Sequence, residues 1–182
     1  MAQRVINEAL ISDAQDGLRV VRLKGGDPLV FGRGGEELQA LKSAGIHFEV
    51  VPGVTAALGS AAFAGIPLTH RNSAQSVRFI TAQLSKENSD IDWAELAREK
   101  QTLVVYMGLA ELPTLTRKLV EHGMDEATPG AVVARASYPD QTVVLGTLSQ
   151  IVDRVNSEEI SGPTTIIVGQ VVMVGGLSSK DN

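Results

Sequence analysis

Residues 19–37 read RVVRLKGGDPLVFGRGGEE, and this stretch decides which fold the chain can adopt. A short β-branched run at 19–23 leads into a glycine-rich loop, and a helical pattern follows from Gly34. Glycines packed so densely between a strand and a helix indicate backbone conformations, or a close ligand approach, that a Cβ atom would forbid. Ligands of open α/β sheets bind at loops that follow the carboxyl ends of strands. The stretch therefore predicts an α/β fold, and it favours a ligand-binding loop over a purely structural turn.

This loop matches neither of the two common phosphate-binding loops. No Gly-Lys-Ser/Thr follows it, which excludes a Walker loop, and Glu37 stands where the dinucleotide fingerprint needs its third glycine after Gly32 and Gly34. From the residues alone, Asp27 has two roles open to it. It can bind a cation or a ribose hydroxyl of a cofactor, or it can cap the turn.

The chain around this loop predicts two units. Residues 1–75 contain helical patterns at 3–16 and 34–44, strand patterns at 19–23 and 48–51, and a helix of small residues after residue 55. Two strands are too little sheet for a stable doubly wound layer. We therefore expect an incomplete N-terminal α/β domain, which either borrows a partner or begins partway through a domain.

The second predicted unit, residues 76–182, is a C-terminal α/β domain with a mixed five-stranded sheet flanked by helices. The turn residues Tyr138, Pro139 and Asp140 separate two apolar runs and indicate an antiparallel pair. The expected strands are 77–81, 102–107, 131–135, 142–145 and 164–172, and the expected helices are 93–99, 112–122 and 149–155, the last capped by Ser149.

Composition limits the classes of function. The chain has 182 residues, a net charge of −5 and no block of Lys or Arg, which argues against a nucleic-acid surface. Cysteine is absent, and this excludes disulfides, thiolate metal sites and cysteine nucleophiles. The most apolar stretch, 54–68, is too short for a membrane span, and no signal-peptide pattern is present. We expect a cytoplasmic protein that binds neither nucleic acid nor membrane and needs no metal.

Five motifs in order resemble those of the tetrapyrrole methylase family, in its uroporphyrinogen-III C-methyltransferase branch. They are KGGDPLVFGRGGEE at 24–37, VPGVTA at 51–56, GIPLTHR at 65–71, YMG at 106–108 and GPT at 162–164. The resemblance runs roughly from residue 3 to residue 176, and the linked order of the motifs makes it specific. It implies two α/β domains with cofactor and tetrapyrrole in the cleft between them.

The resemblance also implies a function. It is the S-adenosylmethionine-dependent C-methylation of uroporphyrinogen III to precorrin-2, in the siroheme and cobalamin branch of porphyrin biosynthesis. The cofactor leaves as S-adenosylhomocysteine, the tetrapyrrole is the substrate partner, and the family implies a homodimer.

Carried onto this sequence, the resemblance implies three groups of site residues. Arg33, Glu36 and Arg71 are the catalytic candidates, and Arg33, His70 and Arg71 face the substrate carboxylates. The implied cofactor-binding residues are Gly25, Gly26, Asp27, Val30, Thr55, Ala56, Met107, Ala136, Pro163 and Thr164.

The chain departs from the family pattern in two places. The family begins with a strand and a Gly-Ala-Gly-Pro-Gly loop, followed by an Asp and a Lys with proposed proton-transfer roles, and none of these is in the sequence. We therefore expect a chain that lacks the N-terminal segment, and its activity as this truncated chain is left open. In addition, residues 134–137 read ARAS where this branch has Glu-x-Gly-Thr, so Ala136 replaces a cofactor-contacting glycine.

Three alternatives remain open. One is a precorrin methylase of cobalamin synthesis. Another is a ribosomal-RNA ribose methyltransferase, against which the run at 65–71 and the lack of basic patches argue. The third is a truncated, non-catalytic cofactor-binding module.

Overall fold

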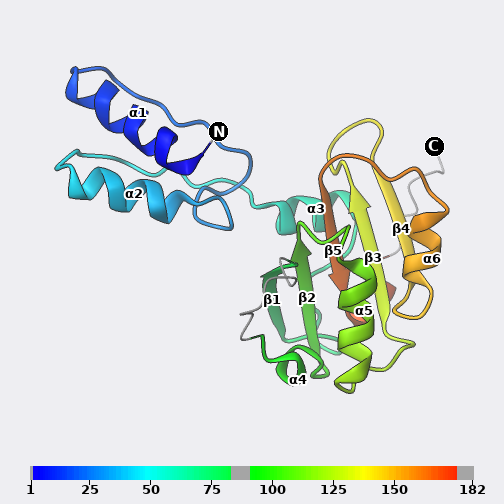
Figure 1. Ribbon diagram of the computed structural model, residues 1–182. Helices are drawn as coiled ribbons and strands as arrows, with labels where there is room; N and C mark the ends of the chain where they lie inside the picture. The colour runs from blue at the N-terminus through cyan, green and yellow to red at the C-terminus, as the bar shows by residue number, and fades with distance from the viewer. Residues whose placement is uncertain (1, 83–90, 176–182) are drawn as a thin grey trace. The chain divides into compact units, whose positions relative to one another are not determined.

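The computed structural model describes residues 2–82 and 91–175, and the chain divides into two compact units (Figure 1). Unit 1 is Met1–Ala56 and unit 2 is Ala57–Asn182. The domain boundary expected after residue 75 stays a prediction.

Unit 2 is built on a mixed five-stranded sheet, as the sequence predicts. Its strand order is β1-β2-β5-β3-β4. β1 pairs in parallel with β2, whereas β5 runs antiparallel to both of its neighbours and β3 runs antiparallel to β4. The strands are β1 (Ser76–Thr81), β2 (Gln101–Tyr106), β3 (Pro129–Ala134), β4 (Thr142–Thr147) and β5 (Thr164–Val168).

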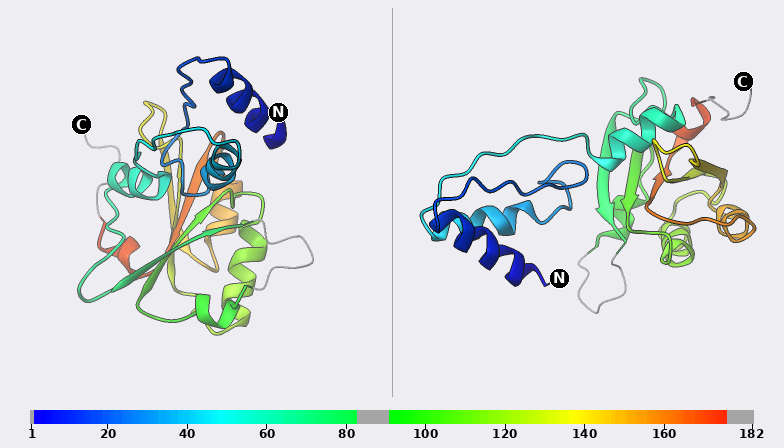
Figure 2. Two further views of the ribbon diagram at one scale, coloured as in Figure 1. Left: turned by 90° about the vertical axis from the view of Figure 1, so that its left-hand side faces the viewer. Right: turned by 90° about the horizontal axis from the view of Figure 1, so that it is seen from above.

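Three helices cover one face of this sheet, and α3 lies on the other (Figures 1 and 2). The covering helices are α4 (Trp93–Leu96), α5 (Leu112–Glu121) and α6 (Ile151–Asn156). α5 buries leucines at helical spacing against the sheet. The largest fully buried side chains are Leu, Ile and Val, as expected for a chain with only 4% aromatic residues.

The helix of small residues, α3 (Ala56–Ala64), packs closely on the sheet of unit 2. Its buried face is Ala57, Ser60, Ala61 and Ala64. Ser60 Oγ donates a hydrogen bond to Thr165 Oγ1 at 2.9 Å, and Ala57 N donates one to Tyr106 Oη at 2.9 Å. Small side chains permit this close approach, so the structure supports a packing role for this face.

Several boundaries in unit 2 differ from the expected ones: α4 ends at Leu96 rather than at residue 99, and β3 spans Pro129–Ala134 rather than 131–135. Gln150, not Ser149, is the N-cap of α6, and the Ser149 hydroxyl is engaged with that of Thr147. The last strand ends at Val168 because Gly169, with φ of 140°, turns the chain into the 3₁₀ helix η1 (Gln170–Met173).

Unit 1 contains α1 (Gln3–Gln15) and α2 (Gly34–Ser43), but the strands expected at 19–23 and 48–51 are not formed. No backbone–backbone hydrogen bond reaches residues 19–24 or 47–52 from anywhere in the described chain. A strand requires a ladder partner, and neither segment provides one for the other. Val21, Leu23 and Val51 are each more than 80% exposed as a consequence.

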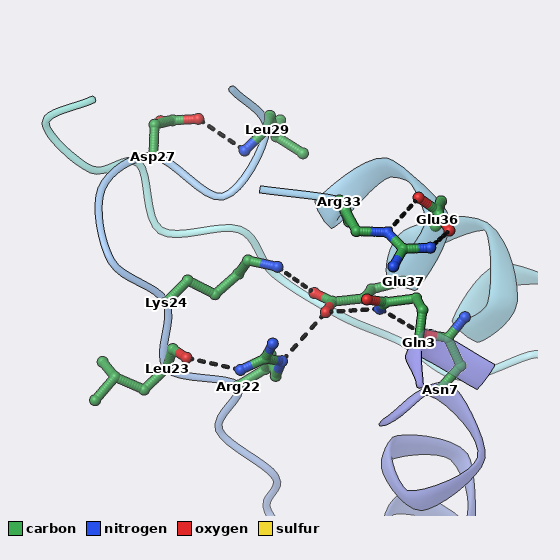
Figure 3. Close-up of polar contacts among 10 residues, drawn as sticks. All are labelled: Gln3, Asn7, Arg22, Leu23, Lys24, Asp27, Leu29, Arg33, Glu36 and Glu37. Carbon is green, nitrogen blue, oxygen red and sulfur yellow. Dashed lines mark hydrogen bonds and ion pairs between the residues drawn. The ribbon is translucent and has the colours of Figure 1, made fainter. Parts of the chain in front are cut away.

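Instead of a sheet, a buried carboxylate joins the parts of unit 1 (Figure 3). Glu37 is 5% exposed. It accepts hydrogen bonds from Gln3 Nε2 (3.0 Å), Lys24 Nζ (3.1 Å) and Arg22 Nε (3.2 Å). Burial alone would raise the pKa of Glu37, but the bonds from Gln3, Lys24 and Arg22 outweigh it and hold the pKa below its ordinary value of 4.5. Glu37 therefore connects α1, the segment 18–24 and α2.

Replacing Glu37 by Gln should destabilise unit 1 by roughly 2 kcal/mol at neutral pH, because Arg22 and Lys24 lose their counter-charge. Since the folded pKa of Glu37 lies below 4.5, the unfolded chain takes up the proton first as the pH falls. The stability from Glu37 is thus present above about pH 4.5 and lost below it, and Glu37→Gln should remove this acid dependence.

Urea unfolding followed by far-ultraviolet circular dichroism tests this prediction. The fluorescence of Trp93 reports separately on unit 2, which contains every Trp and Tyr of the chain. Glu8→Gln is the matched control, because Glu8 forms an exposed ion pair with Arg4 on α1. Equal effects of the two variants would contradict the role of Glu37.

Candidate cofactor and substrate site

The glycine-rich loop of unit 1 is anchored by Asp27. Its Oδ1 accepts a hydrogen bond from Leu29 N at 2.8 Å, and its Oδ2 accepts one from Gly53 N at 3.1 Å. The Leu29 and Gly53 amides hold the pKa of Asp27 below its ordinary value. Of the two roles left open by the sequence, the structure shows the turn-capping one, extended to a second loop. The contact with the cofactor stays a prediction.

The glycines of this region differ in how much space surrounds them. A Cβ atom on Gly34 would lie 2.4 Å from Pro28 O, and one on Gly53 would lie 2.3 Å from Gly26 O. These positions need glycine because two stretches of backbone touch there. By contrast, a Cβ on Gly25 would meet nothing within 4 Å. Gly25 is thus a predicted cofactor residue whose backbone faces open space.

Arg33 and Glu36 form a bidentate ion pair at the start of α2 (Figure 3). Arg33 Nε lies 2.8 Å from Glu36 Oε1, and Nη2 lies 2.7 Å from Oε2. This pairing raises the pKa of Arg33 and lowers that of Glu36, so both side chains stay charged. Arg33 has left-handed backbone (φ 58°) and is the N-cap residue of α2. Both side chains are about half exposed, and Glu36 orients the guanidinium.

The other predicted residues of unit 1 surround this loop. Val30 N donates to Asp27 O at 3.4 Å, within the turn. Thr55 is buried and Ala56 exposed where α3 begins, and a Cβ atom on Gly26 of the loop would lie 3.7 Å from Thr55 Cα and 3.8 Å from Ala56 N.

Unit 2 brings four predicted cofactor residues to one edge of its sheet. Met107 follows β2, Ala136 follows β3, and Pro163 and Thr164 lead into β5. Because β5 runs antiparallel to both neighbours, its amino end meets the carboxyl ends of β2 and β3 at this edge. Met107 is 57% exposed, with φ of 53°.

His70 and Arg71 do not join this group. They lie in a tight turn in which Ala74 N donates to His70 O, and Gln75 N donates to Lys100 O just before β2 begins. The turn therefore lies at the opposite edge of the sheet from Met107. His70 Nδ1 accepts from Asn72 N at 3.3 Å, and Arg71 is exposed. Their role toward the substrate stays a prediction.

Sequence reasoning missed several interactions that hold these segments. The Arg22 and Lys24 contacts with Glu37 were not foreseen, although Glu37 was noted as a break in the glycine pattern. The Tyr106 hydroxyl at the start of α3 was also missed, because no short motif links residues 49 positions apart. The pairing of Arg135 with Asp140 was signalled only by the turn residues between them.

A shallow pocket of about 530 Å³ lies elsewhere in unit 2. Its lining includes Leu145, Arg154 and Met173, and it contains none of the predicted site residues. Arg154 is already bonded to Leu145 O and Gln150 Oε1. Within residues 2–82 and 91–175, no helix is long and apolar enough to cross a membrane. Over the same residues, no three His, Cys, Asp or Glu side chains gather as metal ligands.

Residues 1–152 match the family model of Tetrapyrrole (Corrin/Porphyrin) Methylases. The chain belongs to the tetrapyrrole methylase family. It is 52% identical over 172 residues to siroheme synthase of Hahella chejuensis, covering 94% of this chain but 37% of that protein. The chain therefore spans little more than a third of this relative.

Solved structures of tetrapyrrole methylases share the fold. Uroporphyrin-III C-methyl transferase from Thermus thermophilus, complexed with S-adenyl homocysteine, is 39% identical with a TM-score of 0.81. The match covers 94% of this chain and 75% of that one. A cobalt precorrin-4 methyltransferase is 26% identical with a TM-score of 0.85, over 94% of this chain and 72% of that one. These matches confirm the family resemblance and the fold class expected from the motifs.

The two neighbouring glycines that begin α2 test the loop geometry directly. Gly34→Ala should destabilise unit 1 by roughly 2 kcal/mol, because the new methyl group would overlap Pro28 O and displace the loop. Gly35→Ala meets nothing within 4 Å and should stabilise the helix by about 0.5 kcal/mol. Unfolding followed by circular dichroism measures both changes, and similar values for the pair would refute the close backbone contact.

Proposed function

We propose that this chain is the larger part of a methyltransferase that transfers methyl groups from S-adenosylmethionine to uroporphyrinogen III, giving precorrin-2 and S-adenosylhomocysteine. The observation that carries the proposal is the match over 94% of the chain to a uroporphyrin-III C-methyl transferase complexed with S-adenyl homocysteine. The product would enter siroheme and cobalamin synthesis. We further propose a homodimer in the cytoplasm, with no nucleic-acid partner.

The residues present fit the cofactor. Backbone around Gly25 is open to a ligand, and Met107 offers an exposed apolar side chain next to Pro163 and Thr164. S-adenosylmethionine supplies an activated methyl group on a sulfonium. The chain's own task is to hold that methyl group in line with an electron-rich pyrrole carbon, which contributes much of the rate enhancement. Loss of a proton from the methylated ring is then assisted by a nearby base.

Recognition of the tetrapyrrole requires local positive charge. Uroporphyrinogen carries eight carboxylates, whereas the chain has a net charge of −5. Arg33 is a suitable partner for a substrate carboxylate. Glu36 orients its guanidinium through Nε and Nη2, and Nη1 has no hydrogen-bond partner in the described part of the chain. A guanidinium held in this way can donate to a substrate carboxylate. Arg71 is the second candidate.

A precorrin methylase is the alternative with an observation of its own. The TM-score to cobalt precorrin-4 methyltransferase, 0.85, is higher than the 0.81 of the uroporphyrin enzyme, although the identity is lower. A third alternative is a cofactor-binding module without turnover.

Methyl transfer with labelled S-adenosylmethionine distinguishes these proposals. Purified chain, alone and with the family's N-terminal segment added in trans, is incubated with uroporphyrinogen III, with precorrin-2 or with RNA, and S-adenosylhomocysteine binding is measured in parallel. Labelled precorrin-2 formed from uroporphyrinogen III is the expected result. Binding without transfer to any substrate would favour the non-catalytic module. Transfer only to precorrin-2 or RNA would overturn the proposed substrate.

Arg33→Lys should lower tetrapyrrole turnover about tenfold while the affinity for S-adenosylhomocysteine changes less than about twofold, because a Lys ammonium cannot bind a carboxylate through two parallel N–H groups. Turnover and binding are measured on the same preparation. Arg4→Lys is the matched control, since Arg4 pairs with Glu8 on the exposed face of α1. An equal loss of turnover and cofactor binding would count against Arg33 as a substrate residue.

A further inference from the structure

The loop between β3 and β4, residues 135–141, has a strained backbone at the edge that holds the predicted cofactor residues (Figure 1). Arg135 and Ser137 both have left-handed backbone, with φ of 48° and 73°. Side chains other than glycine adopt this conformation at a cost in free energy. Ala136 lies between the two. Interactions around this loop must therefore hold it in place.

The Arg135 side chain makes those interactions within the loop. Its Nε lies 2.6 Å from Asp140 Oδ2, and its Cζ lies 4.6 Å from the centre of the Tyr138 ring. The guanidinium thus combines an ion pair with a cation–π contact. The hydrogen bond between Arg135 and Asp140 raises the pKa of Arg135 and lowers that of Asp140, so the pair stays charged at neutral pH.

Arg135 also holds the segment that leads into β5. Its backbone N donates to Pro163 O at 3.0 Å. A Cβ atom on Gly162, which has φ of 76°, would lie 3.1 Å from Arg135 Cγ, so the arginine stem rests on the Gly162 backbone. Ala134 and Thr164 are register partners of β3 and β5. One residue therefore contacts both segments that contain Ala136, Pro163 and Thr164.

A second connection fixes the other end of the loop. Gln141 Oε1 accepts from Ser137 N at 3.1 Å, and Gln141 Nε2 donates to Phe63 O of α3 at 3.1 Å. The loop is thus attached to the entry of β5 through Arg135 and to α3 through Gln141. The Arg135 contacts reach both the segment of Ala136 and the entry of β5, whereas those of Gln141 reach the loop and α3.

We infer that Arg135 is a positioning residue of the cofactor site: it clamps the β3–β4 loop to the entry of β5, so that Ala136, Pro163 and Thr164 present a preformed surface to the adenosyl group. This inference rests on the proposed function. The clamp acts where Ala136 stands in place of the family's glycine. Because the Arg135 side chain contacts Asp140, Tyr138 and Gly162, it acts through these neighbours rather than through the reacting atoms.

The test compares Arg135→Ala, Arg135→Lys and Arg117→Ala in the full chain. Arg117 is the matched control, because it forms an exposed ion pair with Glu121 at 2.6 Å on α5. Isothermal titration with S-adenosylhomocysteine should give a Kd raised about fivefold in Arg135→Ala, and unchanged in Arg117→Ala. Arg135→Lys should rescue the affinity in part, since Lys keeps the charge but not the planar stack.

Two further readouts separate positioning from general stability. In the methyl-transfer assay, Arg135→Ala should raise the KM for S-adenosylmethionine and leave the KM for the tetrapyrrole unchanged. In hydrogen exchange of the ligand-free protein, the amides of residues 136–138, 140–141 and Thr164 should exchange about fivefold faster in Arg135→Ala than in Arg117→Ala.

The inference would be overturned if Arg135→Ala had the same Kd for S-adenosylhomocysteine and the same amide exchange rates as the Arg117→Ala control. Failure of the wild-type chain to bind S-adenosylhomocysteine would instead sink the proposed function. The exchange measurement still judges the clamp in that case, because it needs no ligand. Uniformly faster exchange throughout unit 2 would show that Arg135 serves stability alone and would also overturn the inference.

Discussion

The antiparallel placement of β5 between β2 and β3 is the arrangement on which unit 2 depends. Residues 165–168 are all buried, and their backbone groups are bonded to strands on both sides. Buried backbone groups without partners would be costly, so this strand determines the register of its neighbours. Its direction also brings the carboxyl ends of two strands to its own amino end. Residues far apart in the sequence, Met107, Ala136 and Pro163, thereby reach one edge.

The same requirement for backbone partners explains why unit 1 looks so different. Its two extended segments carry the side chains of strands but have no ladder in the described chain. Carboxylates do the connecting instead: Asp27 joins two loops, and Glu37 joins two helices to an extended segment. The open edges also leave large apolar side chains exposed, which is the usual condition of a strand without a neighbour.

Two arginines with left-handed backbone are held by the same kind of interaction, an ion pair with a nearby carboxylate. Arg33 and Arg135 each lie at the edge of a predicted binding segment, and each is paired with a carboxylate three or five residues later. Exposed ion pairs of this kind add little to stability. Their effect is on geometry, because they select one conformation of a strained loop. Arg33 is bonded to its carboxylate through Nε and Nη2, whereas Arg135 is bonded through Nε and packs its guanidinium over the Tyr138 ring.

Much of this protein could be predicted from its sequence. The ordered motifs identified the family and the fold class, and the apolar patterns located all the strands of unit 2 and the main helices, because both signals are local and repeat at a fixed spacing. The role of Asp27 in the turn was foreseen as one of two options. Tertiary structure alone decided that residues 19–23 and 48–51 remain unpaired, since pairing depends on a neighbour and not on propensity. It also decided that the Tyr106 hydroxyl meets α3, that His70 and Arg71 lie at the other edge from Met107, and that Arg135 rests on Gly162. These contacts join residues remote in sequence, and only the packing of the folded chain brings them within bonding distance.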